Sequence, residues 1–125
     1  MSWDEADRVR VRAKLLDLVA RLPGTEPDDS HGHTGFLLRG KRFAWLLADH
    51  HGDGRLALWV KAPPGEQESL VAADATRYFV PAYLGPKGWV GVDLAADPDW
   101  DEVAGLLEQA WRMGATKRAI AEFDG

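Results

Sequence analysis

Residues 55–61 alternate between apolar side chains and a more mixed set. Leu56, Leu58 and Val60 take every second position. The positions between and beside them hold Arg55, Ala57, Trp59 and Lys61. Successive side chains of a β-strand point to opposite faces of a sheet, so this period of two predicts a strand with one buried face and one wetter face. The chain must therefore form a sheet that is covered on one side.

Turn signals place more strands beside this one. After a polar loop, residues 36–39 and 42–48 are rich in apolar side chains and flank Gly40-Lys41, a two-residue separation that suits a tight hairpin. A second turn at 50–54 leads into the alternating segment, which predicts an antiparallel meander of three strands. Two more strands are expected at 78–80 and 89–94. In the second of these, one face carries Val90, Val92 and Leu94, and the other carries Trp89, Gly91 and Asp93.

Helical patterns flank the predicted sheet. Ser2 and Glu5 have capping-box spacing and predict the start of a helix that runs to about Leu22, where Pro23-Gly24 ends it. The face expected to be buried repeats every three or four residues and consists of Trp3, Ala6, Val9, Ala13, Leu16 and Ala20. A short crossover helix is expected at 66–73, after a break rich in proline and glycine.

The C-terminal part of the chain is expected to be helical. Asp97-Pro98 is a favourable N-cap and first-turn pair. The apolar stripe that follows consists of Val103, Leu106, Leu107, Ala110 and Trp111. Gly114 is expected to interrupt this helix and leave 115–123 as a second short helical piece.

These elements predict an α+β fold in a single domain, residues 1–125. The architecture is a two-layer α/β sandwich with an N-terminal helix, an antiparallel sheet of about five strands with a crossover helix, and C-terminal helices. A length of 125 residues suits one domain with one core. With the helices on one face of the sheet, the opposite face is expected to be open.

Composition excludes several classes of function. The absence of cysteine rules out disulfides, thiol catalysis and cysteine-ligated metal sites. The net charge of −5 argues against indiscriminate nucleic-acid binding, although residues 35–94 are not acidic on balance. No signal peptide is evident, and no apolar run approaches the roughly 20 residues that span a bilayer. A cytoplasmic protein without a membrane partner is expected.

Three blocks of the sequence carry a resemblance to a known family. They are Gly40-Lys41-Arg42-Phe43-Ala44, residues 56–62 (Leu-Ala-Leu-Trp-Val-Lys-Ala) and residues 79–92, which contain the pattern Phe-Val-Pro-x-Tyr-x-Gly-x-x-Gly-Trp-Val. In these blocks the chain resembles the MmcQ/YjbR-like family, and the likeness extends over nearly its whole length. The resemblance implies a compact fold likened to that of CyaY and of secretion chaperones. It also implies a DNA-binding role, and it offers no catalytic residues to transfer.

The outward-facing positions of the predicted sheet suggest a binding surface. Trp59 and Trp89 would stack on bases, and nearby basic side chains would meet phosphates. The candidate nucleic-acid or ligand-binding residues are Lys41, Trp59, Lys61, Arg77, Tyr83, Lys87 and Trp89. The alternative is that the two tryptophans cover the sheet and shield the backbone of Gly91, while the charges keep the surface soluble.

Other constellations favour structural interpretations. The loop 83–88 presents Tyr83 and Lys87 and could hold an anion through backbone N–H groups, but it lacks phosphate-loop spacing and is expected to be a structural turn. The histidines match no recognised metal motif and are expected to be solvated in loops; they are His31, His33, His50 and His51. Nothing in the sequence sets a nucleophile, a base and an orienting acid in order. No catalytic residue, metal or cofactor is expected.

The sequence thus predicts a non-enzymatic binding domain with two candidate partners. The first is nucleic acid, specifically DNA, bound through the open sheet face. The second is another protein, with the chain acting as an interaction or chaperone-like adaptor through the same aromatic patch.

Overall fold

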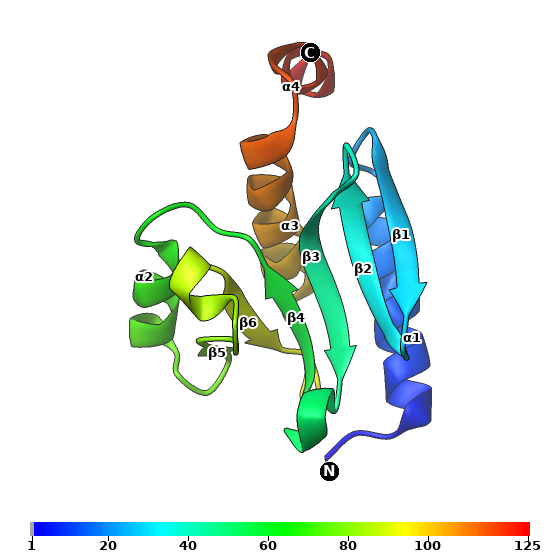
Figure 1. Cartoon of the computed structure of the whole chain (residues 1–125), viewed down its shortest axis with the longest axis vertical. Coiled ribbons are helices and arrows are strands. Elements are labelled where there is room, and N and C mark those ends of the chain that lie inside the picture. Colours follow the sequence, from blue (N-terminus) through cyan, green and yellow to red (C-terminus); the bar gives the residue numbers. More distant parts are fainter. Residues whose placement is uncertain (1) are drawn as a thin grey trace.

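One antiparallel sheet organises the chain. In residues 2–125, which a computed structural model describes, six strands pair in the order β1-β2-β3-β4-β6-β5 (Figure 1). The strands are β1 Thr25–Ser30, β2 His33–Leu38, β3 Lys41–Ala48, β4 Leu56–Val60, β5 Tyr78–Phe79 and β6 Val90–Asp93. All neighbouring strands are antiparallel, which confirms the predicted meander and the two later strands.

Helices pack on one face of this sheet. They are α1 Glu5–Val19, α2 Glu66–Ala73, α3 Trp100–Gly114 and α4 Lys117–Asp124. The connections also contain two 3₁₀ turns, η1 His50–Gly52 and η2 Gly85–Lys87. Figure 1 shows α1 and α3 behind the sheet and α4 beyond the end of α3. Side chains of all four helices pack in or against one core cluster. The α+β class, the N-terminal helix, the crossover helix and the C-terminal helices are therefore confirmed.

The main core lies between the sheet and the helices. Leu56, Leu58 and Val60 of β4 are fully buried in it, as their alternation predicts. The apolar stripe predicted for α3 is buried as well, and Trp111 at its end is completely enclosed. Its indole Nε1–H donates to the carbonyl oxygen of Pro23 at 2.9 Å, which ties α3 to the turn that follows α1.

The sixth strand, β1, was not expected from its sequence. It occupies part of the predicted polar loop and contains Pro27, Asp28 and Asp29, residue types that are rare in strands. It forms because its whole length pairs with β2, and it lies at the edge of the sheet, where proline and acidic residues are tolerated. Pairing with a neighbour therefore outweighs local propensity here.

The hairpin between β2 and β3 turns one residue earlier than expected. Arg39 and Gly40 form the turn with φ of +54° and +78°, and Lys41 already pairs with Leu38. Two central residues with positive φ match the twist of the flanking strands. The prediction of Gly40-Lys41 as the turn is corrected accordingly.

Two helix starts also differ from the prediction. The N-cap of α1 is Asp4 and not Ser2, because Asp4 and Asp7 bond to each other's backbone N–H groups at 2.9 Å in a reciprocal capping box. The N-cap of α3 is Asp99 and not Asp97. The predicted interruption near Gly114 is confirmed, since α3 ends there and a separate helix α4 follows.

The buried face of α1 is the largest departure from the sequence analysis. The helix ends at Val19 rather than near Leu22, and the face predicted to be buried is mostly exposed or half-buried. The residues that enter the core are instead Val11, Leu15, Leu18 and Val19. Both faces of α1 are apolar. The face that is buried carries larger side chains, on the whole, than the alanine-rich face that the sequence predicted to be buried. Its burial removes more apolar area from water.

Candidate functional site

The helix-free face of the sheet holds a second, smaller cluster of apolar side chains. Its members are Leu47, Ala57, Trp59 and Trp89, with Trp45, Phe79 and Leu84 packed against them. Trp59 and Trp89 therefore lie opposite the helices, as the alternation predicts. They are only 5% and 7% exposed, however, which corrects the expectation of an aromatic surface on which bases could stack.

Phe79 of β5 and the loop that follows it explain why these tryptophans are buried. Phe79 lies directly over Gly91, where an added Cβ would sit 2.4 Å from the aromatic ring. The buried amide of Gln67 on α2 donates to the backbone oxygens of Gly85 at 2.9 Å and of Trp89 at 2.6 Å. These two hydrogen bonds hold the loop between β5 and β6 against the sheet. The sequence suggested that the tryptophans shield the backbone of Gly91, but the side chain that lies over it is Phe79. Gln67 was not predicted from the sequence.

Four basic side chains gather in a cleft at one end of the sheet. This basic cleft has a volume of about 320 Å³ and lies between the β2–β3 hairpin and the C-terminal end of α3. Its cationic lining residues are Arg39, Lys41, Arg42 and Lys61, with no acidic residue among the lining side chains. Figure 1 shows the β2–β3 turn and the end of α3 at the same end of the molecule.

The local structure explains how these cations come together. Arg39 lies in the tight turn and Lys41 follows the turn directly. The backbone N–H of Lys61 donates to the Phe43 carbonyl oxygen at 3.0 Å, which keeps Lys61 beside β3 after β4 ends. Arg42 is held in place by Asp28 at 2.9 Å, and its guanidinium lies 4.2 Å from the centre of a Trp45 ring.

Three of the four cations in the basic cleft have free charges. Within residues 2–125, no carboxylate lies within 4.0 Å of the charged nitrogens of Arg39, Lys41 or Lys61. Uncompensated cations that converge in a cleft create a positive potential, which favours the binding of an anion. The sequence analysis named Lys41 and Lys61 but not Arg39 or Arg42. The signal that could have found them is their position in the hairpin turn and at the start of the strand that follows it.

The other candidate residues lie elsewhere. Arg77 lies near the start of α3, between Asp74 at 3.9 Å and Glu102 at 3.7 Å, and its charge is compensated there. Tyr83 is 76% exposed on the rim of a different cavity, and Lys87 is exposed at the end of η2. The structure therefore brings together Lys41 and Lys61 but does not gather the seven predicted residues into one site.

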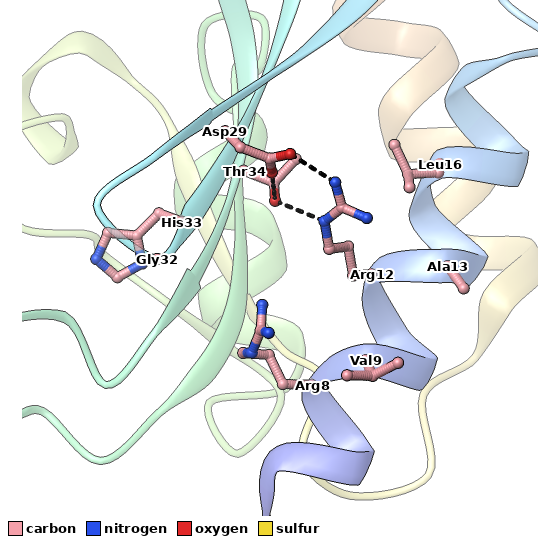
Figure 2. Close-up of a pocket in the computed structure, with 9 residues that line it drawn as sticks. All are labelled: Arg8, Val9, Arg12, Ala13, Leu16, Asp29, Gly32, His33 and Thr34. Atoms are coloured by element: carbon pink, nitrogen blue, oxygen red, sulfur yellow. Dashed lines mark hydrogen bonds and ion pairs between the residues drawn. The ribbon is translucent and has the colours of Figure 1, made fainter.

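A further pocket lies between α1 and the β1–β2 hairpin (Figure 2) and has a volume of about 400 Å³. Figure 2 shows Arg12 reaching from α1 to Asp29 at 2.7 Å and to the hydroxyl of Thr34 at 3.2 Å, while that hydroxyl donates to Asp29 at 2.6 Å. The bonds from Thr34 and Arg12 lower the pKa of Asp29. Arg8 is paired with Glu5 at 2.6 Å. Because its charged groups already satisfy one another, this pocket is a weaker anion site than the basic cleft.

Three of the four histidines lie side by side, because the fold brings His33 next to the consecutive pair His50-His51. The ring centroids of His33 and His50 are 5.6 Å apart, and those of His50 and His51 are 4.1 Å apart. Burial, reinforced by neighbouring histidines, lowers the pKa of His33 and of His50. In the part of the chain that the structure describes, no three His, Cys, Asp or Glu side chains form a group that could hold a metal ion.

Acidification to mildly acidic pH is expected to destabilise the fold through these histidines. The pKa values of His33 and His50 lie below 6.5 in the folded protein, so the unfolded chain binds more protons as the pH falls through 6.5. Their contribution is complete above pH 6.5 and is lost below it. His33 Nδ1 also accepts the backbone N–H of Ala48 at 3.3 Å, and protonation of this nitrogen would remove that bond. Urea unfolding followed at about pH 7.5 and about pH 5.5 measures the loss.

A pair of substitutions separates this effect from general acid sensitivity. The His33→Gln variant does not titrate and keeps an acceptor for Ala48, so we expect it to lose less stability on acidification than the wild type. His31→Gln changes an exposed histidine in the neighbouring turn and serves as the matched control. An equal loss in the wild type and in a double His33→Gln/His50→Gln variant would contradict the histidine explanation.

Comparison with known proteins bears on the family and the fold. A family model described as YjbR matches residues 20–113. The crystal structure of the Deinococcus radiodurans protein DR2400, which has a DUF419 domain, is similar with a TM-score of 0.67 and 22% sequence identity, and the match covers 88% of this chain and 85% of that one. At this identity the likeness shows a shared fold. A search of curated proteins finds no match. None of the helices in residues 2–125 has the length and apolar character needed to cross a membrane.

Proposed function

The chain belongs to the YjbR family, and from that premise we propose that it is a non-enzymatic cytoplasmic domain that binds DNA. The basic cleft is the part of the surface that contacts the phosphates. The observation that carries the proposal is the convergence of Arg39, Lys41 and Lys61 in one cleft, where no carboxylate of residues 2–125 pairs with them. This local charge is opposite to the net charge of the chain, which is −5.

The chemistry of the cleft suits phosphate oxygens. Lysine ammonium groups act as point charges toward phosphate, and an arginine guanidinium can donate two parallel hydrogen bonds to it. Lys41 and Lys61 supply the first kind of contact and Arg39 the second. Arg42 lies over Trp45 and is paired with Asp28, so its charge is compensated and the three unpaired cations supply the positive potential.

The charge distribution orients the domain toward its partner. Glu66 and Glu68 begin α2, and Asp101 and Glu102 begin α3, so acidic side chains lie on the helical layer. A polyanion is repelled from the acidic starts of α2 and α3 and attracted to the hairpin end. Contacts to phosphates position a protein on DNA without reading its sequence. The proposal is therefore binding without strong sequence preference and with marked salt dependence.

A protein-interaction adaptor, the other expectation from the sequence, has less support. It needs an exposed apolar patch, and Trp59 and Trp89 are buried. The exposed apolar side chains near them are Val80 and Tyr83. The basic cleft supports a polyanion better than these two side chains support a protein partner.

Salt-dependent binding of a fluorescently labelled duplex tests the proposal. If Arg39, Lys41 and Lys61 each contact one phosphate, affinity should fall roughly 40-fold between about 50 and about 200 mM salt. With Lys41→Gln and Lys61→Gln combined, one contact remains and the fall should shrink to roughly 3- to 4-fold. Fluorescence anisotropy measures both dissociation constants.

A matched control removes the same charge from a different surface. Arg10→Gln combined with Lys14→Gln changes two cations of α1, which lies on the helical layer. We expect this variant to keep the salt slope of the wild type. No binding at about 50 mM salt, or a wild-type slope in the Lys41/Lys61 variant, would overturn the proposal and shift attention to a protein partner.

A further inference from the structure

A second cavity lies on the helix-free side of the sheet. It has a volume of about 350 Å³, which lies within the range of small-molecule sites. Its walls come from η1, the residues between η1 and β4, β4 itself, β5 and the segment that follows β5. The lining residues are His50, His51, Asp53, Arg55, Trp59, Phe79, Val80, Ala82 and Tyr83. None of them lines the basic cleft.

The rim of this cavity combines exposed apolar groups with strained backbone. Val80 is 56% exposed and Tyr83 is 76% exposed, although both are large and apolar or aromatic. Tyr83 and His51 also have φ of +63° and +51°, in the left-handed region that residues with side chains rarely adopt. Such conformations are found preferentially at ligand sites. Positive φ also occurs in other turns of the chain, at His31, Arg39, Asp49 and Asp97, so the exposed apolar side chains are what distinguish this rim.

One free cation lines the cavity. The guanidinium of Arg55 lies 4.0 Å from the centre of the Phe79 ring, which fixes the plane of the group. Within the described chain Arg55 has no ion-pair partner within 4.0 Å. Its guanidinium N–H groups are therefore available to a ligand, and their fork geometry matches a carboxylate.

The cavity wall also contains a polar group without a partner. The side chain of Trp59 is buried, and its indole N–H has no hydrogen-bond acceptor in the structure. An unpaired buried donor destabilises a fold, so a group of this kind calls for an explanation. The ring of His50 packs edge-on against the Trp59 ring, with 5.1 Å between the ring centroids, but it does not accept a hydrogen bond from the indole N–H. The indole nitrogen itself is closed off from the cavity, so a ligand there contacts the ring of Trp59 and is reported by its N–H signal without bonding to it.

From these observations we propose that the cavity binds a small aromatic monocarboxylate. The carboxylate pairs with Arg55, and the ring lies against the aromatic side chains of Trp59, Phe79 and Tyr83. A single negative charge fits because the wall holds one free cation, Arg55, and one carboxylate, Asp53, which would repel a dianionic phosphate more strongly. Burial lowers the pKa of His50, so this histidine adds no second positive charge at neutral pH. The site is independent of the DNA proposal.

Titration of the ¹⁵N-labelled protein with three probes tests the chemistry of the ligand. The probes are 2-naphthoate, 2-naphthamide, which lacks the charge, and cyclohexanecarboxylate, which lacks the aromatic ring. We expect 2-naphthoate to bind with a dissociation constant of about 1 mM or tighter and to shift the indole N–H signal of Trp59. The other two probes should bind at least about tenfold more weakly.

Two variants locate the site. Arg55→Gln should weaken 2-naphthoate binding at least about tenfold, whereas Arg21→Gln, an equal change of charge at an exposed position of the turn after α1, should leave it unchanged. Tyr83→Ala changes a side chain that is 76% exposed, and it should weaken binding through loss of ring contact. Shifts confined to the basic cleft, equal binding of naphthoate and naphthamide, or no shift at Trp59 would each overturn the proposal.

Discussion

Replacement of Trp111 by alanine is expected to lower the free energy of unfolding by about 3–5 kcal/mol. Trp111 is fully buried at the end of α3, and its ring packs against Phe123 of α4 at 5.0 Å. The substitution removes this packing and leaves the carbonyl oxygen of Pro23 without its donor. Because small domains are stable by only about 5–15 kcal/mol, much of the stability should be lost. Urea unfolding followed by far-UV circular dichroism measures the change.

A conservative variant separates the two contributions of this tryptophan. Trp111→Phe keeps an aromatic ring in the core but cannot donate to Pro23, so we expect it to cost clearly less than the alanine variant, about 1–3 kcal/mol. Equal losses in the two variants would show that the hydrogen bond dominates. A Trp111→Ala variant as stable as the wild type would contradict the assignment of this residue to the core.

Replacement of Gly91 by alanine is the second substitution with a large expected effect. Gly91 lies in β6 between Trp59 of β4 and Phe79 of β5. An added Cβ would sit 2.4 Å from two ring carbons of Phe79, which is too close for any relaxed contact. Either Phe79 or the strand must move, and such overpacking typically costs about 1–3 kcal/mol. The displaced ring would also disturb the stacked guanidinium of Arg55. Chemical denaturation measures the loss in free energy of unfolding, and shifts in the NMR signals of Phe79 and Arg55 report the disturbance of their contact.

The chain offers a matched control for this glycine. Gly105 lies in α3, and an added Cβ there meets nothing within 4 Å. Gly105→Ala should therefore stabilise the protein by about 0.5–1 kcal/mol, through the higher helix propensity of alanine. If the steric explanation is correct, Gly91→Ala should cost less in a Phe79→Ala background than in the wild type. Equal cost in both backgrounds would refute it.

The candidate site was only partly accessible from the sequence. The alternation around β4 correctly assigns Trp59 to the face opposite the helices, and that of residues 89–94 correctly assigns Trp89 to it. It cannot show that the segment after β5 folds over them, because that cover depends on contacts such as the bond between Gln67 and Trp89, which lie far apart in the chain. The gathering of Lys41 and Lys61 likewise depends on strand register, and a shift of the hairpin by one residue changes which cations flank the turn.

Local pattern is enough to specify most of the elements of this protein. Period-two alternation identifies β4 and β6, and the repeat of three and four residues identifies α3 and its buried stripe, because each element exposes its periodicity directly in the order of side chains. The short helix α2 is found at the predicted residues. These features depend on backbone geometry within one segment.

The tertiary structure decides which of several locally acceptable surfaces are used. Helix α1 has two apolar faces, and the larger side chains enter the core because that arrangement buries more apolar area against the sheet. The acidic, proline-containing β1 becomes a strand because β2 offers it hydrogen-bond partners. Trp59 and Trp89 are buried because Phe79 and the loop after it lie on the same face. In each case the outcome depends on a free energy shared between segments, which no single segment encodes.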